Sequence, residues 1–237
     1  MEQTGNMRNK TFKIGFAVGI VAGVIALFTA AFIWFTGGTG QASRAIAAPL
    51  IEANGTGTLF QIVPEKSEAR FIIDEVLIGQ PKSVVGKTDQ VAGQLIVDFQ
   101  SPEKSQLGMI KINVRTLTTD NEFRNRALRG QILQSTKPEF EFATFVPTDL
   151  IGLPKTLTIG QSASFQIAGN FTLRGVTHTV TFDATLMPVS RALMTGSAKA
   201  TINRADFKLI IPEAPGVANV GEDVRLEIDF TAALLAA

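Results

Sequence analysis

The chain of 237 residues has no cysteine and no tyrosine, and only one histidine and one tryptophan. Without cysteine there can be no disulfide, no thiol nucleophile and no zinc or haem site of the Cys/His type. A catalytic triad would depend entirely on His178, and no Gly-x-Ser-x-Gly element is present to supply a nucleophile. We therefore expect a protein that is not an enzyme and has no cofactor.

Charge is also scarce. Lys and Arg number 22 and Asp and Glu 21, and charged residues make up only 18% of the chain. Nucleic-acid binding needs a basic excess, so that class of function is excluded. A hydrophobic fraction of 45% argues against disorder, and the length suits one main domain with appendages.

The apolar residues are concentrated in one uncharged run over residues 14–36. A run of about 20 apolar residues is long enough to span a bilayer. Basic residues in segment 1–13 precede it, which by the positive-inside rule places the N-terminus in the cytoplasm. The sequence therefore predicts a single-pass anchor of the cell membrane, with the rest of the chain extracytoplasmic.

Residues 37–57 are rich in Gly, Thr, Ala and Ser, a composition that favours a flexible linker. The folded domain is expected over residues 58–237. A small-x-small sequence ending at Ala47 resembles a signal-peptidase site, so a secreted or periplasmic product cleaved near Ala47 is the alternative to an anchored one.

From residue 58 onward apolar side chains recur with period two, which is typical of strands with one buried face. In segment 223–232, Val224, Leu226, Ile228 and Phe230 alternate with charged residues and threonine. About nine such segments are present, at 59–63, 67–74, 91–99, 109–114, 139–146, 164–174, 176–186, 191–203 and 223–232. The pattern predicts an all-β fold, an antiparallel sheet curled into a barrel or a strongly curled sandwich.

The inward faces of these strands carry many phenylalanines, with small residues between them. Small residues beside flat rings leave room for a hydrocarbon chain, although an eight-stranded barrel can equally be packed solid. The predicted tunnel lining consists of Phe71, Phe99, Phe142, Phe165, Phe171, Phe182, Met194, Gly196, Ala198 and Phe230.

One segment breaks the alternation. Thr119 to Gly130 begins with a Thr-x-x-Glu capping box and ends at a glycine suited to a C-cap, which predicts a short helix. Arg124, Arg126 and Arg129 on this helix either form a solvated face or bind an anionic head group through forked hydrogen bonds.

His178 is in phase with the apolar side of its strand, near the strand's start. It is either a hydrogen-bonded residue that closes the end of the barrel or a contact to a polar ligand head.

Two sequence blocks carry a family resemblance. Arg115 to Asn121, followed by Arg124-Asn125 and by Lys137 to Phe142, resembles the middle signature of the YceI-like, polyisoprenoid-binding family. Gly169 to Thr177 resembles the family's hairpin, and Asn203-Arg204-Ala205-Asp206-Phe207 its late R-x-D-F element. Asn125 and Lys208 depart from the residues usual at those places.

The resemblance implies an exported, extended antiparallel barrel of lipocalin-like shape with one short helix, which holds a long isoprenoid chain in an apolar tunnel. We therefore expect binding or carrying of an isoprenoid lipid of the quinone or polyprenyl phosphate type outside the cytoplasmic membrane. The alternative is a membrane-anchored structural or interaction domain with a solid core and no ligand. The oligomeric state is left open, with a homodimer as one option.

Overall fold

The computed structural model of the chain describes residues 42–43, 46–51 and 57–235. The predicted cytoplasmic segment 1–13 and the predicted anchor 14–36 lie outside the described residues. Within the described ranges, no helix has the length and apolar character needed to cross a membrane.

The described part of the chain is mostly β-structure. Its strands are β1 (Thr58–Ile62), β2 (Glu68–Leu77), β3 (Gln80–Thr88), β4 (Val91–Ala92), β5 (Gln94–Val97), β6 (Gln106–Leu107), β7 (Ile110–Asn113), β8 (Phe142–Ile151), β9 (Ala163–Leu173), β10 (Val176–Pro188), β11 (Leu193–Asn203), β12 (Val217–Ala218) and β13 (Asp223–Leu234). Its helical elements are η1 (Pro64–Lys66), η2 (Pro102–Lys104), η3 (Val114–Thr116), α2 (Glu122–Ala127), η4 (Leu128–Ile132) and η5 (Pro138–Phe140).

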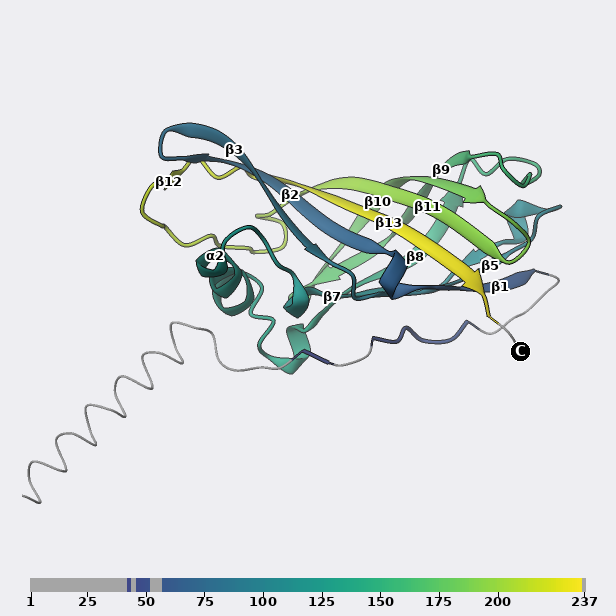
Figure 1. The fold of residues 1–237 in the computed structure, drawn as a ribbon, viewed down its shortest axis with the longest axis horizontal. Coiled ribbons are helices and arrows are strands. Elements are labelled where there is room, and N and C mark those ends of the chain that lie inside the picture. The colour runs from purple at the N-terminus through teal and green to yellow at the C-terminus, as the bar shows by residue number, and fades with distance from the viewer. Residues whose placement is uncertain (1–41, 44–45, 52–56, 236–237) are drawn as a thin grey trace, which may run out of the picture.

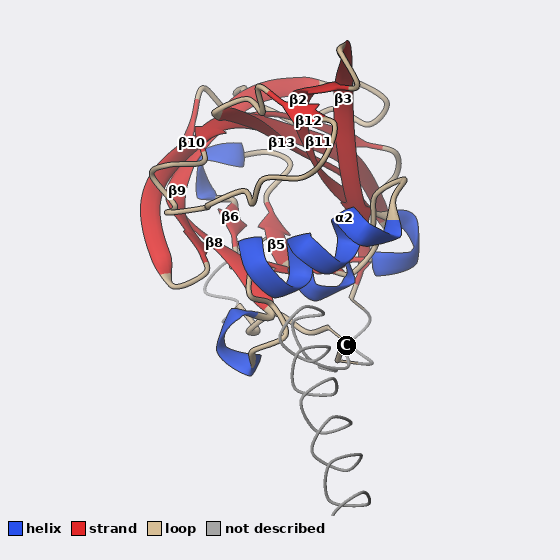
Figure 2. Cartoon of the chain, turned by 90° about the vertical axis from the view of Figure 1, so that its left-hand side faces the viewer, coloured by secondary structure: helices blue, strands red, loops and turns tan. Residues whose placement is uncertain are grey.

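The strands form one strongly curled antiparallel sheet (Figure 1). β7, β8, β9, β10, β11 and β13 pair in that order, and β13 pairs in turn with both β1 and β2. β1 pairs with β5 and β2 with β3, while β4, between β3 and β5 in the chain, pairs with β7. Viewed from the end that carries α2, the strands lie around a common axis (Figure 2).

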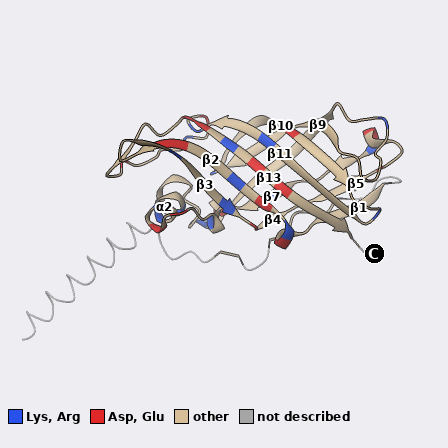
Figure 3. Cartoon of the chain, turned by 45° about the horizontal axis from the view of Figure 1, so that its top comes forward, with Lys and Arg blue, Asp and Glu red and all other residues tan. Residues whose placement is uncertain are grey.

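The period-two pattern accounts for the two faces of this sheet. In β13, Val224, Leu226, Ile228 and Phe230 point inward, as predicted. Charged residues are spaced along β2, β11 and β13 (Figure 3). There the Arg70 guanidinium pairs across strands with Glu227 and Asp229, at 2.6 Å each. The all-β, antiparallel prediction is confirmed.

Strand β3 was not predicted, because only two adjacent valines stand out from its polar sequence. Its Gly86 lies directly opposite Phe71 of β2, and the Phe71 ring occupies the space that a side chain at Gly86 would need. A glycine thus faces inward where an apolar residue would have revealed the alternation.

The hairpin predicted between residues 173 and 176 is confirmed. Arg174 has φ 50° and Gly175 φ 73°, the left-handed pair of a two-residue turn between β9 and β10.

The short helix is confirmed, but its limits differ from those predicted. Asn121 is the N-cap, and its side-chain oxygen accepts two backbone hydrogen bonds of the first turn, at 2.9 and 3.1 Å. Thr119 was the predicted cap, but asparagine caps a helix as well as threonine does and stands immediately before this one. Gly130 lies inside the π-helical turn η4 rather than at a C-cap.

The described part of the predicted linker lies against the domain. The backbone N–H of Ser43 donates to Glu141 Oε1 at 2.7 Å, and that of Ile51 donates to Gln94 Oε1 at 2.9 Å. At Ser43 and Ile51 the segment predicted as a linker is therefore hydrogen-bonded to the domain.

The tip of the β2–β3 hairpin holds an isoleucine in a conformation that suits other residues better. Ile78 has φ 50° and is 81% exposed, so a β-branched side chain is strained there without gaining burial. We predict that Ile78→Asn raises the free energy of unfolding by roughly 1 kcal/mol, since asparagine tolerates this region before a glycine. Urea denaturation measures it, with Ile210→Asn, at another exposed isoleucine, as the unaffected control. A loss of stability in Ile78→Asn would contradict the strain.

Candidate functional site

A cavity of about 290 Å³ lies inside the curled sheet. It runs from α2 and η4 at one end, where Leu128 lines it, to the loops that hold Ser105 and Leu157. Its wall is almost wholly aliphatic and aromatic. The volume is at the lower end of the range for small-molecule sites.

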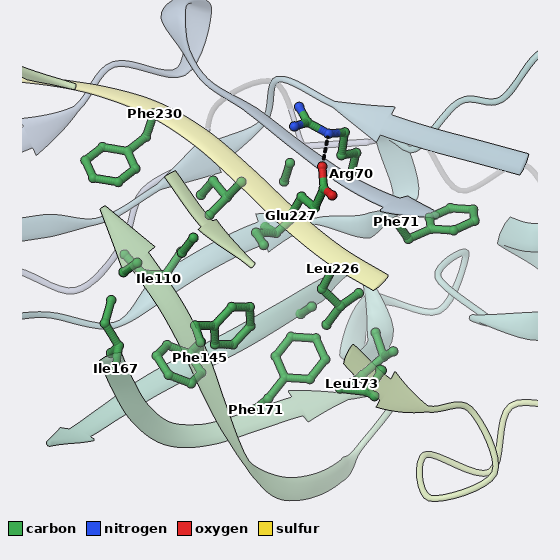
Figure 4. Close-up of a pocket in the computed structure, with 18 of the residues that line it drawn as sticks. Arg70, Phe71, Ile110, Phe145, Ile167, Phe171, Leu173, Leu226, Glu227 and Phe230 are labelled. Carbon is green, nitrogen blue, oxygen red and sulfur yellow. Dashed lines mark hydrogen bonds and ion pairs between the residues drawn. The ribbon is translucent and has the colours of Figure 1, made fainter. Parts of the chain in front are cut away.

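The aromatic wall is built by neighbouring strands. Phe145 of β8 and Phe182 of β10 meet edge to face, with ring centroids 5.0 Å apart. Phe171 of β9 lies on the same side of the cavity as Phe145, opposite Phe230 and Leu226 of β13 (Figure 4). Rings on both sides leave a slot whose chemistry suits hydrocarbon.

The structure brings together only part of the predicted lining. Six of the residues do line the cavity, namely Phe71, Phe165, Phe171, Phe182, Ala198 and Phe230. Four do not, namely Phe99, Phe142, Met194 and Gly196.

Phe142 is on the other face of the sheet. Ala143 and Phe145 point inward, so the alternation places Phe142 outside, where the ammonium of Lys111 lies 3.9 Å from its ring centroid. The predicted phase of this strand was therefore wrong by one residue, because two phenylalanines three positions apart cannot share a face. Phe145 is the inward ring that the sequence analysis missed.

Phe99 and Met194 face inward but fill space. Met194 is fully buried, and Phe99 packs against Phe60 with ring centroids 6.5 Å apart. Both belong to an apolar cluster around β1 and the end of β13, beyond the cavity wall. At this end of the barrel the inward side chains fill the core, as the alternative of a solidly packed barrel predicts.

Gly196 seats an aromatic ring. A methyl group placed on it would lie 2.5 Å from the ring of Phe230, its cross-strand partner. The glycine therefore leaves no hollow of its own, but it allows Phe230 to lie flat against the sheet and form the wall.

The cavity has a polar end near α2. Glu75 of β2 lines it with a side chain only 6% exposed, and its Oε1 accepts from Arg124 Nη2 at 2.7 Å. Arg124, also in the lining, donates through Nη1 to Asp120 at 2.5 Å. Glu75 was not predicted as a cavity residue, because the predicted strand ended one residue earlier. It is nevertheless in phase with Phe71 and Ile73.

The other predicted head-group residues do not line the cavity. Arg126 is exposed, with its guanidinium 5.7 Å from the ring of Phe123 on the helix surface. Arg129 lies 3.9 Å from a Glu122 oxygen. His178 is exposed too, and its Nε2 donates to the backbone carbonyl of Asp206 at 3.0 Å. Of the predicted set, only Arg124 reaches the cavity.

Comparison with known proteins agrees with this architecture. The profile of the YceI-like domain matches residues 60–232, nearly the whole of the curled sheet. The chain belongs to the YceI-like family.

Solved structures show the same fold. BcnA from Burkholderia cenocepacia is 18% identical, with a TM-score of 0.56 over 73% of this chain and 99% of that one. A polyisoprenoid-binding domain from Saccharophagus degradans, implicated in plant cell wall breakdown, is 11% identical, with a TM-score of 0.57 over 76% and 100%. The Campylobacter jejuni YCEI protein is 17% identical, with a TM-score of 0.52 over 64% and 85%. Among curated proteins no match was found.

The late element of this YceI-like domain packs against the cavity wall. Phe207 is 1% exposed and packs edge to face on Phe171, with centroids 5.5 Å apart, and on the His178 ring at 5.1 Å. Arg204 lines the cavity and donates through Nε to the Gly221 carbonyl at 3.0 Å and through Nη1 to the Leu209 carbonyl at 3.4 Å. Arg204 thus holds the loop that carries Phe207.

Asn125, one of the two departures from the family pattern, has a structural task. It is 1% exposed, and its Oδ1 accepts from the backbone N–H and the hydroxyl of Thr119 at 2.7 and 2.8 Å. Its amide donates to Glu122 Oε1 at 3.0 Å. An amide satisfies both kinds of partner, whereas an aspartate could not donate to Glu122.

The middle signature of the YceI-like domain holds a buried ion pair outside the cavity. Arg115 Nη1 lies 3.2 Å from Glu141 Oε2, with side-chain exposures of 7% and 8%. Asn113 donates to the other Glu141 oxygen at 3.0 Å. Burial opposes ionisation of Glu141, but the hydrogen bonds from Ser43 and Asn113 and the charge of Arg115 outweigh it, and the pKa of this carboxyl lies below its ordinary value.

Proposed function

We propose that this YceI-like domain binds and carries a long-chain isoprenoid lipid, of the quinone or polyprenyl type, with its tail in the cavity. The observation that carries the proposal is the largely apolar cavity itself, walled by Phe145, Phe171 and Phe230. A chain of methyl and methylene groups fits a wall that offers almost no hydrogen-bond partner.

The comparison with the polyisoprenoid-binding domain from Saccharophagus degradans supports the ligand class by analogy of fold. We propose binding rather than catalysis because the sequence has no Gly-x-Ser-x-Gly element to accompany its single histidine. A binding or carrying role requires only the apolar cavity.

The proposed place of action is outside the cytoplasmic membrane. The uncharged run 14–36 is the observation behind it, as a single-pass anchor or, after cleavage near Ala47, as a removed leader. An anchored domain could accept its lipid from the same membrane. The alternative, a structural or interaction domain with a solid core, has no use for a cavity of this size.

Affinity should depend on tail length. For prenyl alcohols with one to four isoprene units, we predict that each added unit strengthens binding at least about tenfold until the cavity is full, because each buried methylene contributes about 0.8 kcal/mol. Displacement of a fluorescent apolar probe from the purified full chain measures this. Affinity that does not change with tail length, or absence of binding, would overturn the proposed function.

A further inference from the structure

The charges at the α2 end of the cavity point to the kind of head group that it accepts. We propose that Glu75 makes the cavity select a lipid with an uncharged polar head, a hydroxyl or a carbonyl, over its phosphorylated counterpart. The inference rests on the proposed function and narrows its ligand class.

Glu75 is an unusual residue for its position. In β2 it follows Ala69, Phe71 and Ile73 on the inward face, so the strand carries a carboxylate to the wall of an apolar cavity. Its side chain is 6% exposed. An anionic ligand head at this end would meet a like charge with little water between them, which is strongly unfavourable.

Arg124 does not offset this repulsion, because its guanidinium already serves two carboxylates. Nη2 donates to Glu75 at 2.7 Å and Nη1 to Asp120 at 2.5 Å. Its other N–H groups can still donate to a phosphate oxygen, but its positive charge is already shared between two carboxylates.

The second cation at this end, Arg204, donates to the backbone rather than to a carboxylate. Its two described hydrogen bonds go to the Gly221 and Leu209 carbonyls, in the segment that follows Phe207. A neutral head brings no negative charge close to Glu75, and its carbonyl can accept from an arginine N–H or its hydroxyl can donate to Glu75.

The test compares two ligands with one tail. Geranylgeraniol and its monophosphate are titrated against the purified full chain by probe displacement, so that the tail contribution cancels in the ratio of dissociation constants. We expect the alcohol to bind at least about tenfold more tightly than the phosphate. In Glu75→Gln the ratio should fall about tenfold, mainly because the phosphate binds more tightly.

Glu68→Gln is the matched control, because Glu68 lies on the same strand but pairs with Arg70 on the outer face and does not line the cavity. Its ratio should match that of the unaltered chain. Asp120→Asn, at a half-exposed site, should lower the ratio by about threefold, and it keeps the test decisive if Glu75→Gln does not fold.

Equal binding of both ligands by the unaltered chain, or a ratio unmoved by Glu75→Gln and Asp120→Asn, would overturn this inference alone. Binding of neither ligand would overturn the proposed function and this inference with it.

Discussion

Ala198→Trp is expected to abolish lipid binding while leaving the domain folded. Ala198 is 9% exposed and lies in the middle of β11, opposite Ala184 of β10 and Ile228 of β13, all three of which line the cavity. An indole ring at this point would occupy a large share of about 290 Å³. We predict a loss of affinity of at least about 100-fold, equivalent to roughly 3 kcal/mol.

The stability of the same variant separates a hollow barrel from a solid one. Overpacking a filled core costs typically 1–3 kcal/mol, whereas a ring that enters an existing cavity adds contacts without displacing atoms. We therefore expect the free energy of unfolding to stay within about 0.5 kcal/mol of its original value. The matched control is Lys199→Trp, which places the same ring on the outer face, and it should bind lipid normally. Unchanged binding in Ala198→Trp would show that the ligand does not use this cavity.

Glu141→Gln should be among the most destabilising single changes outside the apolar core. It keeps the shape of the side chain but removes the carboxylate that pairs with the buried Arg115 guanidinium. Removal of one partner of a buried pair is strongly unfavourable, and we predict a loss of about 3 kcal/mol at neutral pH. Denaturant titration at pH 7 measures this loss. The surface change Glu227→Gln should lose less than about 1 kcal/mol, because both partners of its pair are partly exposed.

The pH dependence of stability should follow from the same group. The folded-state pKa of Glu141 is lowered, so its contribution is present above the unfolded pKa of about 4.3 and is lost as the pH falls through the folded value. Asp120 acts in the same direction, since the hydrogen bond from Lys82 chiefly lowers its pKa. We expect stability to decrease below about pH 4. Glu141→Gln should flatten this decrease, and an unchanged slope would contradict the assignment.

The fold could be predicted from the sequence because its main determinant is local. Alternation in segments such as 223–232 fixes which residues face inward, and the turn at Arg174 and Gly175 needs only neighbouring residues. Where alternation fails, prediction failed as well. β3 has a glycine at an inward position, and the seat that Gly86 provides for Phe71 depends on pairing between strands.

The candidate site was less predictable, because its parts are brought together by the curl of the sheet. Alternation found inward rings such as Phe171 and Phe230, but it could not separate them from Phe99, which packs beyond the cavity. The charge pattern of the helix suggested three equivalent arginines. Only pairing with Glu75, from a distant strand, singles out Arg124.

The outcome for the arginines changes what the site is expected to bind. Arg126 lies on the solvated face of the helix. Arg124 reaches the cavity, but its charge is already balanced by Glu75 and Asp120. In the late element, Arg204 holds the loop that carries Phe207 through two hydrogen bonds to backbone carbonyls. The cavity is therefore largely apolar, and the arginine that the helix contributes to it is already paired with carboxylates.

Mass spectrometry of an organic extract of the purified full chain shows directly whether the domain carries a lipid. We expect a long-chain isoprenoid with an uncharged head, close to one molecule per chain, and its disappearance from the extract of Ala198→Trp prepared in parallel. An extract without any isoprenoid, or one in which the same lipids accompany both proteins in equal amounts, would contradict this expectation.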